Sequence, residues 1–324
     1  MNKIKSAVIG LGRIASLLED DTLREKPCTH TGAITANPDC ELVSGCDIND
    51  ERRRLFSEKW QVPVYSDAKE MLRIHKPQLV SIATHPDSHY YYCCLAKETG
   101  VPVIICEKPL ADNIRDARKI TKLAKDGTII LTNHERRYSQ DYIRIKNILE
   151  EERFGKLLSI RAILYMGKSK RLVDVFWHDG THLADIIMFL AGGILKHKRR
   201  WGAKLTSKEG TAWLEGQVNK IPVVIEVGAK RDHLVFEMEF SCEKGRLRIG
   251  NGIYEVQESA PSPYAENFRS LKNTGENFTD PTGYFANMIK DAVACVKDPG
   301  HQPVSGAIDG LRVIEYLNSV SSWR

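Results

Sequence analysis

The chain has 324 residues, which at ~150 residues per domain predicts about two domains. Apolar residues make up 42% and charged residues 27%, and these proportions exclude wholesale disorder and fibrous repeats. Lys and Arg total 47 against 42 for Asp and Glu, and both signs are interspersed along the chain, so we expect no nucleic-acid partner.

The cysteines and the longest apolar stretch indicate in which cellular compartment the protein is expected. The eight cysteines show neither a C-x-x-C pair nor zinc-finger spacing, which predicts reduced thiols and no metal ligands. The most apolar stretch, residues 186–195, is interrupted by Gly192 and Gly193 and is too short to cross a ~30 Å hydrocarbon layer. No export signal is recognisable at the amino terminus. We therefore expect a cytoplasmic protein without a membrane span.

Residues 1–132 alternate short β-branched runs with longer mixed segments, the pattern of parallel strands joined by helices. The predicted strands are residues 4–9, 41–46, 79–83, 103–106 and 128–131. The predicted helices are residues 50–60, 67–75, 88–99 and 113–125. This pattern predicts an α/β domain with a doubly wound parallel sheet.

Residues 133–324 follow a different rhythm. Residues 233–240 alternate, which places Leu234, Phe236, Met238 and Phe240 on one side of a half-buried strand. Further strands are expected at 157–166, 211–218, 222–227 and 246–249, and helices at 142–151, 182–190, 283–296 and 305–320. We expect an α+β domain with a mainly antiparallel open sheet, abutting the first domain to form a cleft.

The sequence Gly10-Leu11-Gly12-Arg13-Ile14-Ala15 follows the first strand and matches G-x-G-x-x-G/A. In this motif the first glycine permits a tight turn, and the second lets the backbone approach a pyrophosphate at the start of a helix. A chance glycine turn is the alternative. The position after the first strand favours a dinucleotide site that includes Gly10, Gly12, Arg13 and Ile14.

Asp47 ends the second strand, where a carboxylate binds ribose hydroxyls and repels a 2′-phosphate. This favours NAD, with NADP as the other option. Alternatively, Asp47 only starts a turn at residues 47–50, and Arg52 to Arg54 either serve a phosphate or form a solvated helix face. Asp47 lies 32 residues beyond Ala15, against ~20 in the standard unit, so residues 16–29 are interpreted as an insertion beside the phosphate loop.

Two further motifs carry candidate catalytic groups. Lys108, in Glu107-Lys108-Pro109, follows a strand at the carboxyl edge of the predicted sheet, where an amine can steady an alkoxide. A surface Lys in a turn is the alternative.

Residues 177–185 stand at a predicted helix start, with His178, His182 and Asp185 on one face and Asp179 beside His182. His182 is a candidate proton acceptor, and the alternatives are a capping Asp179 with a core histidine, or a metal site.

Two basic clusters remain, residues 168–171 and 196–200. The first is interpreted as a solvated loop, with contact to an acidic or phosphorylated substrate as the alternative.

These residues together resemble the Gfo/Idh/MocA family of oxidoreductases. The resemblance rests on the glycine motif, His30-Thr31-Gly32-Ala33-Ile34, Thr84-His85-Pro86-Asp87-Ser88-His89, Glu107-Lys108-Pro109, Arg136-Arg137-Tyr138 and residues 180–185. It implies an NAD(P)-dependent dehydrogenase acting on a sugar, nucleotide sugar or cyclitol, with a Rossmann domain followed by an antiparallel-sheet domain. It also implies a homodimer or homotetramer.

The resemblance also implies roles for individual residues. Lys108 and His182 would be catalytic, and Thr84, His85 and Glu107 would lie along the nicotinamide side of the cofactor. Arg137, Tyr165 and His178 would contact the substrate together with Lys108 and His182. His85 stands where the family usually has Pro, and the family's usual Asp position holds His178 with Asp179 one place later. The third catalytic residue is therefore Asp179 or His178.

Two rival functions are also compatible with these residues. One is a glycosidase that uses NAD for transient oxidation, and the other is a non-catalytic regulator that binds NAD.

Overall fold

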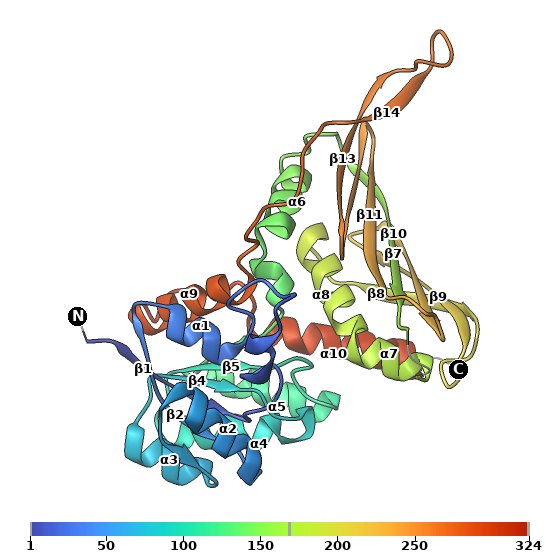
Figure 1. Cartoon of the computed structure of the whole chain (residues 1–324). Helices are drawn as coiled ribbons and strands as arrows, with labels where there is room; N and C mark the ends of the chain where they lie inside the picture. The colour runs from blue at the N-terminus through green and yellow to red at the C-terminus, as the bar shows by residue number, and fades with distance from the viewer. Residues whose placement is uncertain (1, 168–169, 323–324) are drawn as a thin grey trace. The chain divides into compact units, whose positions relative to one another are not determined.

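The computed structural model describes residues 2–167 and 170–322. Positions 168 and 169 of the first basic cluster therefore lie outside the described residues. The chain forms two compact units, one of Met1–Ser139 with Gly283–Ile314 and one of Gln140–Thr282 with Glu315–Arg324 (Figure 1). These units differ from the expected ranges 1–132 and 133–324 because residues 133–139 and 283–314 belong to the first unit.

The first unit is built on a six-stranded parallel sheet in the order β3-β2-β1-β4-β5-β6. The expected doubly wound sheet is thus confirmed, and the two-residue strand β3 is an addition that the sequence did not indicate. The strands are β1 (Ile4–Ile9), β2 (Cys40–Cys46), β3 (Val64–Tyr65), β4 (Leu79–Ile82), β5 (Val103–Cys106) and β6 (Ile129–Thr132).

Side-chain caps fix where the helices of this unit begin. Asn49, Asp67 and Asn113 each accept a hydrogen bond from a backbone N–H in the first turn of the helix that follows. The predicted starts at 50, 67 and 113 agree to within one residue. The helices are α1 (His30–Ala36), α2 (Asp50–Trp60), α3 (Ala68–His75), α4 (His89–Glu98) and α5 (Ile114–Lys125), with 3₁₀ turns η1 (Leu17–Asp20), η2 (Pro86–Ser88) and η3 (Glu135–Tyr138).

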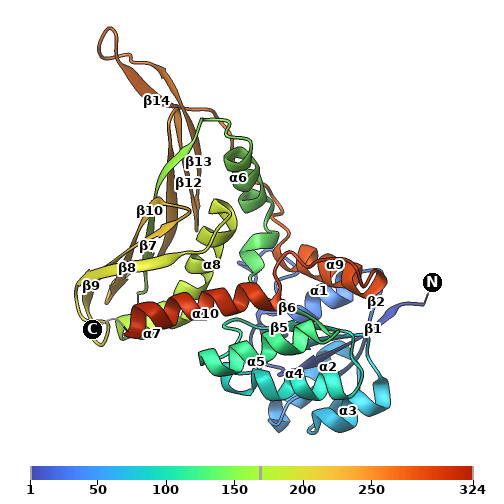
Figure 2. The ribbon, with the colours of Figure 1, turned by 180° about the vertical axis from the view of Figure 1, so that it is seen from behind.

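Helix α9 (Tyr284–Lys297) completes the core of the first unit although it begins 152 residues after Thr132, the last residue of the sheet. It packs beside α1, as both ribbon views show (Figures 1 and 2). Its buried Phe285, Met288 and Ala292 join one apolar cluster with Val8 and Leu131 of the sheet. Without α9 this apolar cluster would be exposed to solvent, so the first unit needs residues from both ends of the chain.

The second unit contains an eight-stranded sheet in the order β14-β13-β12-β11-β7-β10-β9-β8. Its neighbouring strands are antiparallel except β7 and β10, which are parallel. The mainly antiparallel sheet is thus confirmed. The strands are β7 (Leu157–Tyr165), β8 (Lys196–Gly202), β9 (Gly210–Val218), β10 (Ile221–Ala229), β11 (Val235–Cys242), β12 (Gly245–Gly250), β13 (Ile253–Pro261) and β14 (Arg269–Asn273).

Strand β11 shows how the alternating pattern divides the two faces of this sheet. Phe236, Met238 and Phe240 are buried on one face, as expected. The carboxylates of Glu237 and Glu239 lie on the other face, where each pairs with an arginine of β12. The prediction for Leu234 was wrong, because β11 begins at Val235 and Leu234 is 52% exposed.

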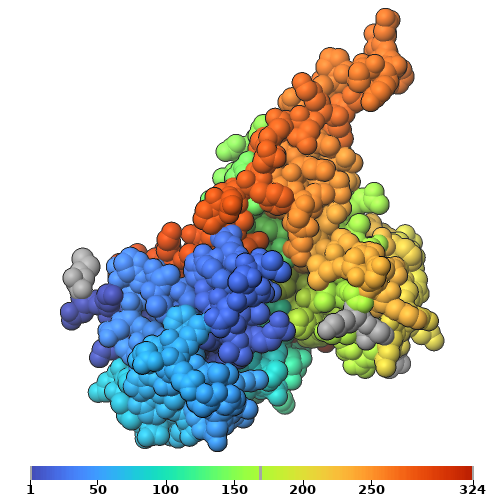
Figure 3. Space-filling model, in the orientation of Figure 1, coloured from blue at the N-terminus to red at the C-terminus, as the bar shows by residue number. Residues whose placement is uncertain are grey.

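Helices and one long hairpin complete the second unit. The helices are α6 (Gln140–Glu150), α7 (Leu172–His178) and α8 (Gly180–Ala191), and α10 (Ala307–Ser322) is divided between the units. The hairpin of β13 and β14 appears in orange as a narrow projection of its unit (Figure 3). The exposed Tyr264 lies in the turn between these two strands. Among the helices of residues 2–167 and 170–322, none has the length and apolar composition to span a membrane.

Candidate functional site

The strand register of the first unit brings the predicted cofactor residues to one edge of its sheet. Ile9 pairs with both Cys46 and Ile82, and Ile82 pairs with Cys106. The residues that follow these strands therefore leave the sheet together at its carboxyl edge. Ligands of doubly wound folds bind at this edge, where the strand order reverses, here between β1 and β4. The residues gathered there are Gly10, Asp47, Thr84, Glu107 and Lys108.

Gly10 occupies a position that only glycine tolerates. Its φ is +86°, in the left-handed region, and a Cβ added there would lie 2.7 Å from the carbonyl oxygen of Ala83. The Gly10 N–H donates to the Cys46 carbonyl at 2.7 Å. The turn after β1 is therefore packed tightly against the neighbouring strand end.

Gly12 is different, because a Cβ added there would meet only the guanidinium of Arg52, at 3.8 Å. The protein itself does not require a glycine at this position. The motif requires one so that a pyrophosphate can approach the backbone, and the open space above Gly12 fits that group. Arg13 is exposed and Ile14 is half-buried beside this space.

The helix expected directly after the glycine motif is interrupted, and on this point the prediction was wrong. Ser16 N–H bonds to the Gly12 carbonyl, which makes one turn, but the regular helix α1 begins only at His30. His30 N–H then donates to the Ile14 carbonyl at 3.2 Å and Thr31 N–H to that of Ala15 at 2.9 Å. Residues 16–29 thus loop out of the helix as an insertion. Asp47 lies 32 positions after Ala15, and subtracting the 14 residues of the insertion leaves a spacing of 18. This value is close to the standard spacing of ~20.

Glu19 holds the insertion in place. Its carboxylate accepts hydrogen bonds from the Thr29 hydroxyl at 2.6 Å and from the Cys28 N–H at 3.2 Å. The same carboxylate packs over Gly32, where an added Cβ would lie 2.3 Å from it. The Trp60 indole N–H also donates to the Ser16 hydroxyl at 2.7 Å. The insertion is therefore an ordered part of the first unit.

The Asp47 carboxylate is tied to the phosphate loop. Oδ2 accepts a hydrogen bond from the Leu11 N–H at 2.8 Å, and Oδ1 accepts one from the Asn49 N–H at 2.9 Å. Arg52 Nη1 lies 3.5 Å from Oδ2. Asp47 thus starts the turn before α2, which was the alternative to a ribose-binding role. The same carboxylate also fixes the glycine loop. Each oxygen keeps a second lone pair for a ligand hydroxyl.

The turn after β4 contains Thr84 and His85. The Ser88 hydroxyl donates to Thr84 Oγ1 at 2.8 Å, and the side chain of His85 is exposed. His89 is fully buried, with its ring nitrogens 3.2 Å from the carbonyl oxygens of Thr84 and Leu110. His89 therefore links this turn to the segment that follows β5.

Glu107 is buried at the end of β5, and its carboxylate has two hydrogen-bonding partners on other elements. His30 Nε2 lies 2.7 Å from Oε1, and the Asn133 side-chain amide donates to the same oxygen. Burial opposes ionisation of this carboxyl. The hydrogen bonds to His30 and Asn133 and the charge of Lys108 outweigh burial and hold the pKa of Glu107 below its usual value.

Lys108 is half-buried, and its backbone N–H donates to Oε2 of Glu107 at 3.1 Å. A second carboxyl, that of Glu135, also interacts with the charge of Lys108. Burial raises the pKa of Glu135, while the charges of Arg136 and Lys108 oppose that rise. The lysine thus stands in an acidic environment beside the predicted nicotinamide side.

Arg137 has contacts of a different kind. Its buried guanidinium donates to the Val304 carbonyl at 2.9 Å and lies 3.3 Å from Oδ2 of Asp309. These contacts join η3 to the segment after α9 within the first unit. The contact of Arg137 with substrate stays a prediction.

In the second unit, His178 and His182 lie on two different helices. His178 is the last residue of α7, Asp179 follows it, and His182 stands in the first turn of α8. The prediction that 178, 182 and 185 share one helical face was therefore wrong for His178, because the chain bends at Asp179. Asp179 makes no side-chain cap bond to α8, and its Oδ2 lies 3.1 Å from His178 Nδ1.

Tyr165, at the end of β7, donates its hydroxyl to the carboxylate of Glu226 on β10. The guanidinium of Arg231 lies 5.0 Å from the centre of the tyrosine ring. Burial and Glu226 raise the pKa of Tyr165 to about 12, so its hydroxyl stays protonated at neutral pH. Tyr165 can therefore donate a hydrogen bond but is not a base.

The contacts of His30, His89 and Asn133 were not predicted from the sequence. His30 and His89 stood within the quoted motifs, but nothing in the spacing showed that His30 would reach Glu107, 77 residues away. Asn133 directly follows β6, and its position at a strand end was the one available signal.

Comparison with known proteins agrees with the fold and the glycine loop. Residues 4–134 match the family model of Gfo/Idh/MocA proteins, described as an oxidoreductase family with an NAD-binding Rossmann fold. A putative NADPH-dependent oxidoreductase from Desulfitobacterium hafniense superposes with a TM-score of 0.82, at 16% identity, over 99% of this chain and 95% of that one. That likeness shows the same fold.

Two curated relatives match in sequence. D-apiose dehydrogenase of Paraburkholderia graminis is 29% identical over 231 residues, 67% of this chain and 58% of the relative. The inositol 2-dehydrogenase/D-chiro-inositol 3-dehydrogenase of Shouchella clausii is 26% identical over 164 residues, 49% and 44% of the two chains. This chain spans about half the length of the relatives that it matches. The predicted resemblance to the Gfo/Idh/MocA oxidoreductase family is thus confirmed over residues 4–134, which match its NAD-binding Rossmann fold.

Proposed function

We propose that this protein is an NAD(P)-dependent oxidoreductase that moves a hydride between nicotinamide and a hydroxyl-bearing carbon of a sugar, nucleotide sugar or cyclitol. One observation carries the proposal: Gly10, Asp47 and the Glu107–Lys108 pair leave the parallel sheet at the same edge. The names of the matched relatives, which act on D-apiose and inositols, support this substrate class. A cytoplasmic homodimer or homotetramer is part of the same proposal.

The cofactor preference follows from Asp47. Its buried carboxylate is held by Leu11 and Asn49, so it is oriented before a ribose arrives. The charge would repel a 2′-phosphate, although Arg52, 3.5 Å away, offsets part of that repulsion. We therefore propose NAD as the preferred cofactor and NADP as a weaker one.

The roles of the side chains follow from their chemistry. When bound, the nicotinamide supplies or accepts the electron pair. Lys108 donates a hydrogen bond that steadies the substrate oxygen as it gains charge, and Glu107 positions Lys108. His182 exchanges the hydroxyl proton, and Asp179, paired with His178, completes the catalytic set.

Reduction of NAD with a panel of free polyols and nucleotide sugars, followed by NADH fluorescence, tests this function. Net NADH formation with one substrate class is the expected result. Release of an aglycone without net NADH would instead indicate a glycosidase that oxidises its substrate transiently. Tight NAD binding with no turnover on any of these compounds would indicate a regulator and contradict the proposal.

A further inference from the structure

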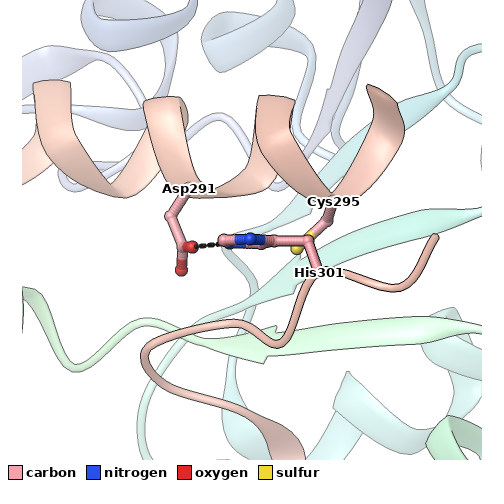
Figure 4. Close-up of side chains that lie close together, drawn as sticks. All are labelled: Asp291, Cys295 and His301. Atoms are coloured by element: carbon pink, nitrogen blue, oxygen red, sulfur yellow. Dashed lines mark hydrogen bonds and ion pairs between the residues drawn. The ribbon is translucent and has the colours of Figure 1, made fainter. Parts of the chain in front are cut away.

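Three metal-binding residue types meet in the first unit, and none of them belongs to the motifs assigned to the nucleotide site. Asp291 and Cys295 lie one turn apart on α9, and His301 lies in the loop that follows (Figure 4). Their ligand atoms all lie within 4.8 Å of one another, and His301 Nε2 is 2.7 Å from Oδ1 of Asp291. Among the residues that the structure describes, this is the one such His, Cys, Asp or Glu cluster.

The Asp291 carboxylate is arranged as a metal-binding carboxylate usually is. Its Oδ2 accepts hydrogen bonds from the Tyr138 hydroxyl and from the Val304 N–H, both at 2.9 Å. These donors fix the carboxylate so that Oδ1 is directed at His301. Ligating carboxylates in proteins are typically oriented by such outer hydrogen bonds, which do not use the coordinating oxygen.

The three residues differ in their access to solvent. Asp291 and Cys295 are buried, whereas the side chain of His301 is 35% exposed. His301 therefore stands on the solvent side of the cluster, where an ion can enter. Burial and the charge of Asp291 raise the pKa of the Cys295 thiol to about 12, so the thiol carries its proton in the absence of a metal.

We propose that Asp291, Cys295 and His301 form a Zn²⁺ site with a fourth position open to water. One thiolate, one imidazole and one carboxylate suit Zn²⁺ far better than the hard cations Mg²⁺ and Ca²⁺. On binding, the thiol releases its proton to solvent and the Zn–S bond forms. The proton on His301 Nε2, which is hydrogen-bonded to Asp291 Oδ1, leaves to solvent while Nδ1 carries the ring proton, and the freed Nε2 lone pair binds the ion.

Only small movements are needed. Tetrahedral Zn²⁺ with bonds of ~2.0–2.3 Å holds its donor atoms about 3.5 Å apart. The widest separation in the cluster must therefore close by little more than about 1 Å, and the 2.7 Å between His301 Nε2 and Asp291 Oδ1 must open by about 1 Å or less. The bound ion would fasten the loop after α9 to that helix, and we assign it a structural role.

The test uses the full chain, freed of metal with a chelator, and Co²⁺ as the spectroscopic probe. We expect a saturable thiolate-to-cobalt charge-transfer band at one ion per chain, and displacement of Co²⁺ by Zn²⁺. Cys295→Ser abolishes this band, and His301→Ala weakens Zn²⁺ binding more than about 100-fold, beyond the effect of losing an outer hydrogen bond. Tyr138→Phe removes only such a bond and weakens binding about 10-fold.

Cys94→Ser is the matched control, since Cys94 is a half-buried thiol on α4 outside the cluster, and it leaves the band unchanged. No uptake of Co²⁺ or Zn²⁺ by the folded wild type would show that the cluster is a hydrogen-bonded contact only. A charge-transfer band that persists in Cys295→Ser would place the ion elsewhere. Either result overturns the proposal. If a variant does not fold, the titration of the wild type with Co²⁺ and Zn²⁺ still shows whether the protein binds the metal.

Discussion

His30 Nε2 lies 2.7 Å from Oε1 of Glu107, which joins the first residue of α1 to the residue that follows β5. Both side chains are buried, and the His30 ring packs edge-on against Phe285 of α9. The interrupted helix, the sheet edge and α9 therefore meet at one carboxylate. Because Lys108 follows Glu107 directly, this contact also fixes the backbone that carries the proposed catalytic lysine.

Glu107→Gln should make the contribution of the His30–Glu107 contact visible as a pH-dependent loss of stability. The folded protein holds the pKa of Glu107 below its ordinary value of 4.5, so the carboxylate stabilises the fold above about pH 4.5 and loses this effect as pH falls below it. We expect Glu107→Gln to lower the free energy of unfolding by about 1–3 kcal/mol at pH 7, measured with urea. The difference from wild type should shrink towards pH 4. Glu41→Gln, at an exposed position, is the control, and a difference independent of pH would contradict the assignment.

Gly10→Ala should destabilise the protein more than a positive φ alone explains. Gly10 and Gly127 have similar φ values, +86° and +93°, but only Gly10 has neighbours within reach of a Cβ. Gly127→Ala should cost about 1–2 kcal/mol from its left-handed conformation. Gly10→Ala should cost more and abolish NAD binding. Equal losses of stability in thermal or urea unfolding would show that the contact with Ala83 is unimportant.

Asp47→Ala should change the choice of cofactor. The variant loses a charged acceptor for ribose hydroxyls, so NAD should bind about 10-fold more weakly or worse. NADP should lose less, because the same carboxylate repels its 2′-phosphate. Fluorescence titration of both dinucleotides measures the ratio. Asp50→Ala, which removes an exposed carboxylate three residues on, should leave it unchanged. A parallel loss for NAD and NADP would rule out discrimination by Asp47.

Glu19→Ala should loosen the insertion. It removes the acceptor for Thr29 and Cys28, and residues 17–28 would then be held mainly by surface contacts. We expect faster trypsin cleavage after Arg24 in the native protein, by about 10-fold if ~1.4 kcal/mol of local stability is lost. Asp20→Ala removes only an exposed ion pair with Lys59 and should change the rate little. Equal rates in all three proteins would mean that Glu19 does not anchor this segment.

Lys108→Ala and His182→Ala should each lower turnover by about 100-fold or more. The affinity for NAD should stay nearly unchanged, because neither side chain is proposed to bind the adenosine half or the pyrophosphate. Initial rates and a separate NAD titration distinguish the two effects. Lys125→Ala, at the exposed end of α5, is the control for loss of a positive charge. Wild-type turnover in both variants would remove these residues from the mechanism.

Local patterns in the sequence predicted most of the first sheet. Strands β1 and β5 have the predicted bounds, and α2 matches them as well, because Asn49 caps it and the apolar runs are continuous. The carboxyl edge follows from strand direction alone, so the gathering of Gly10, Asp47 and Glu107 could also be predicted.

Other features depend on contacts between distant segments. The sequence pattern predicted a helix at residues 283–296, but nothing in that pattern showed that the helix would cover the first sheet. The insertion hid the helix that begins at His30, since the pattern after Gly12 is broken for 14 residues. No local pattern indicated the bend at Asp179, where α7 ends at His178 and α8 begins at Gly180, so His178 and His182 were expected on one helix but lie on two.

Titration of the purified full chain with NAD and with NADP tests the central claim most directly, that the turn after β1 and the neighbouring strand ends hold a nicotinamide dinucleotide. We predict saturable NAD binding with Kd below about 1 mM, weaker NADP binding, and loss of both in Gly10→Ala but not in Gly127→Ala. A folded protein that binds neither dinucleotide at millimolar concentration would contradict the claim.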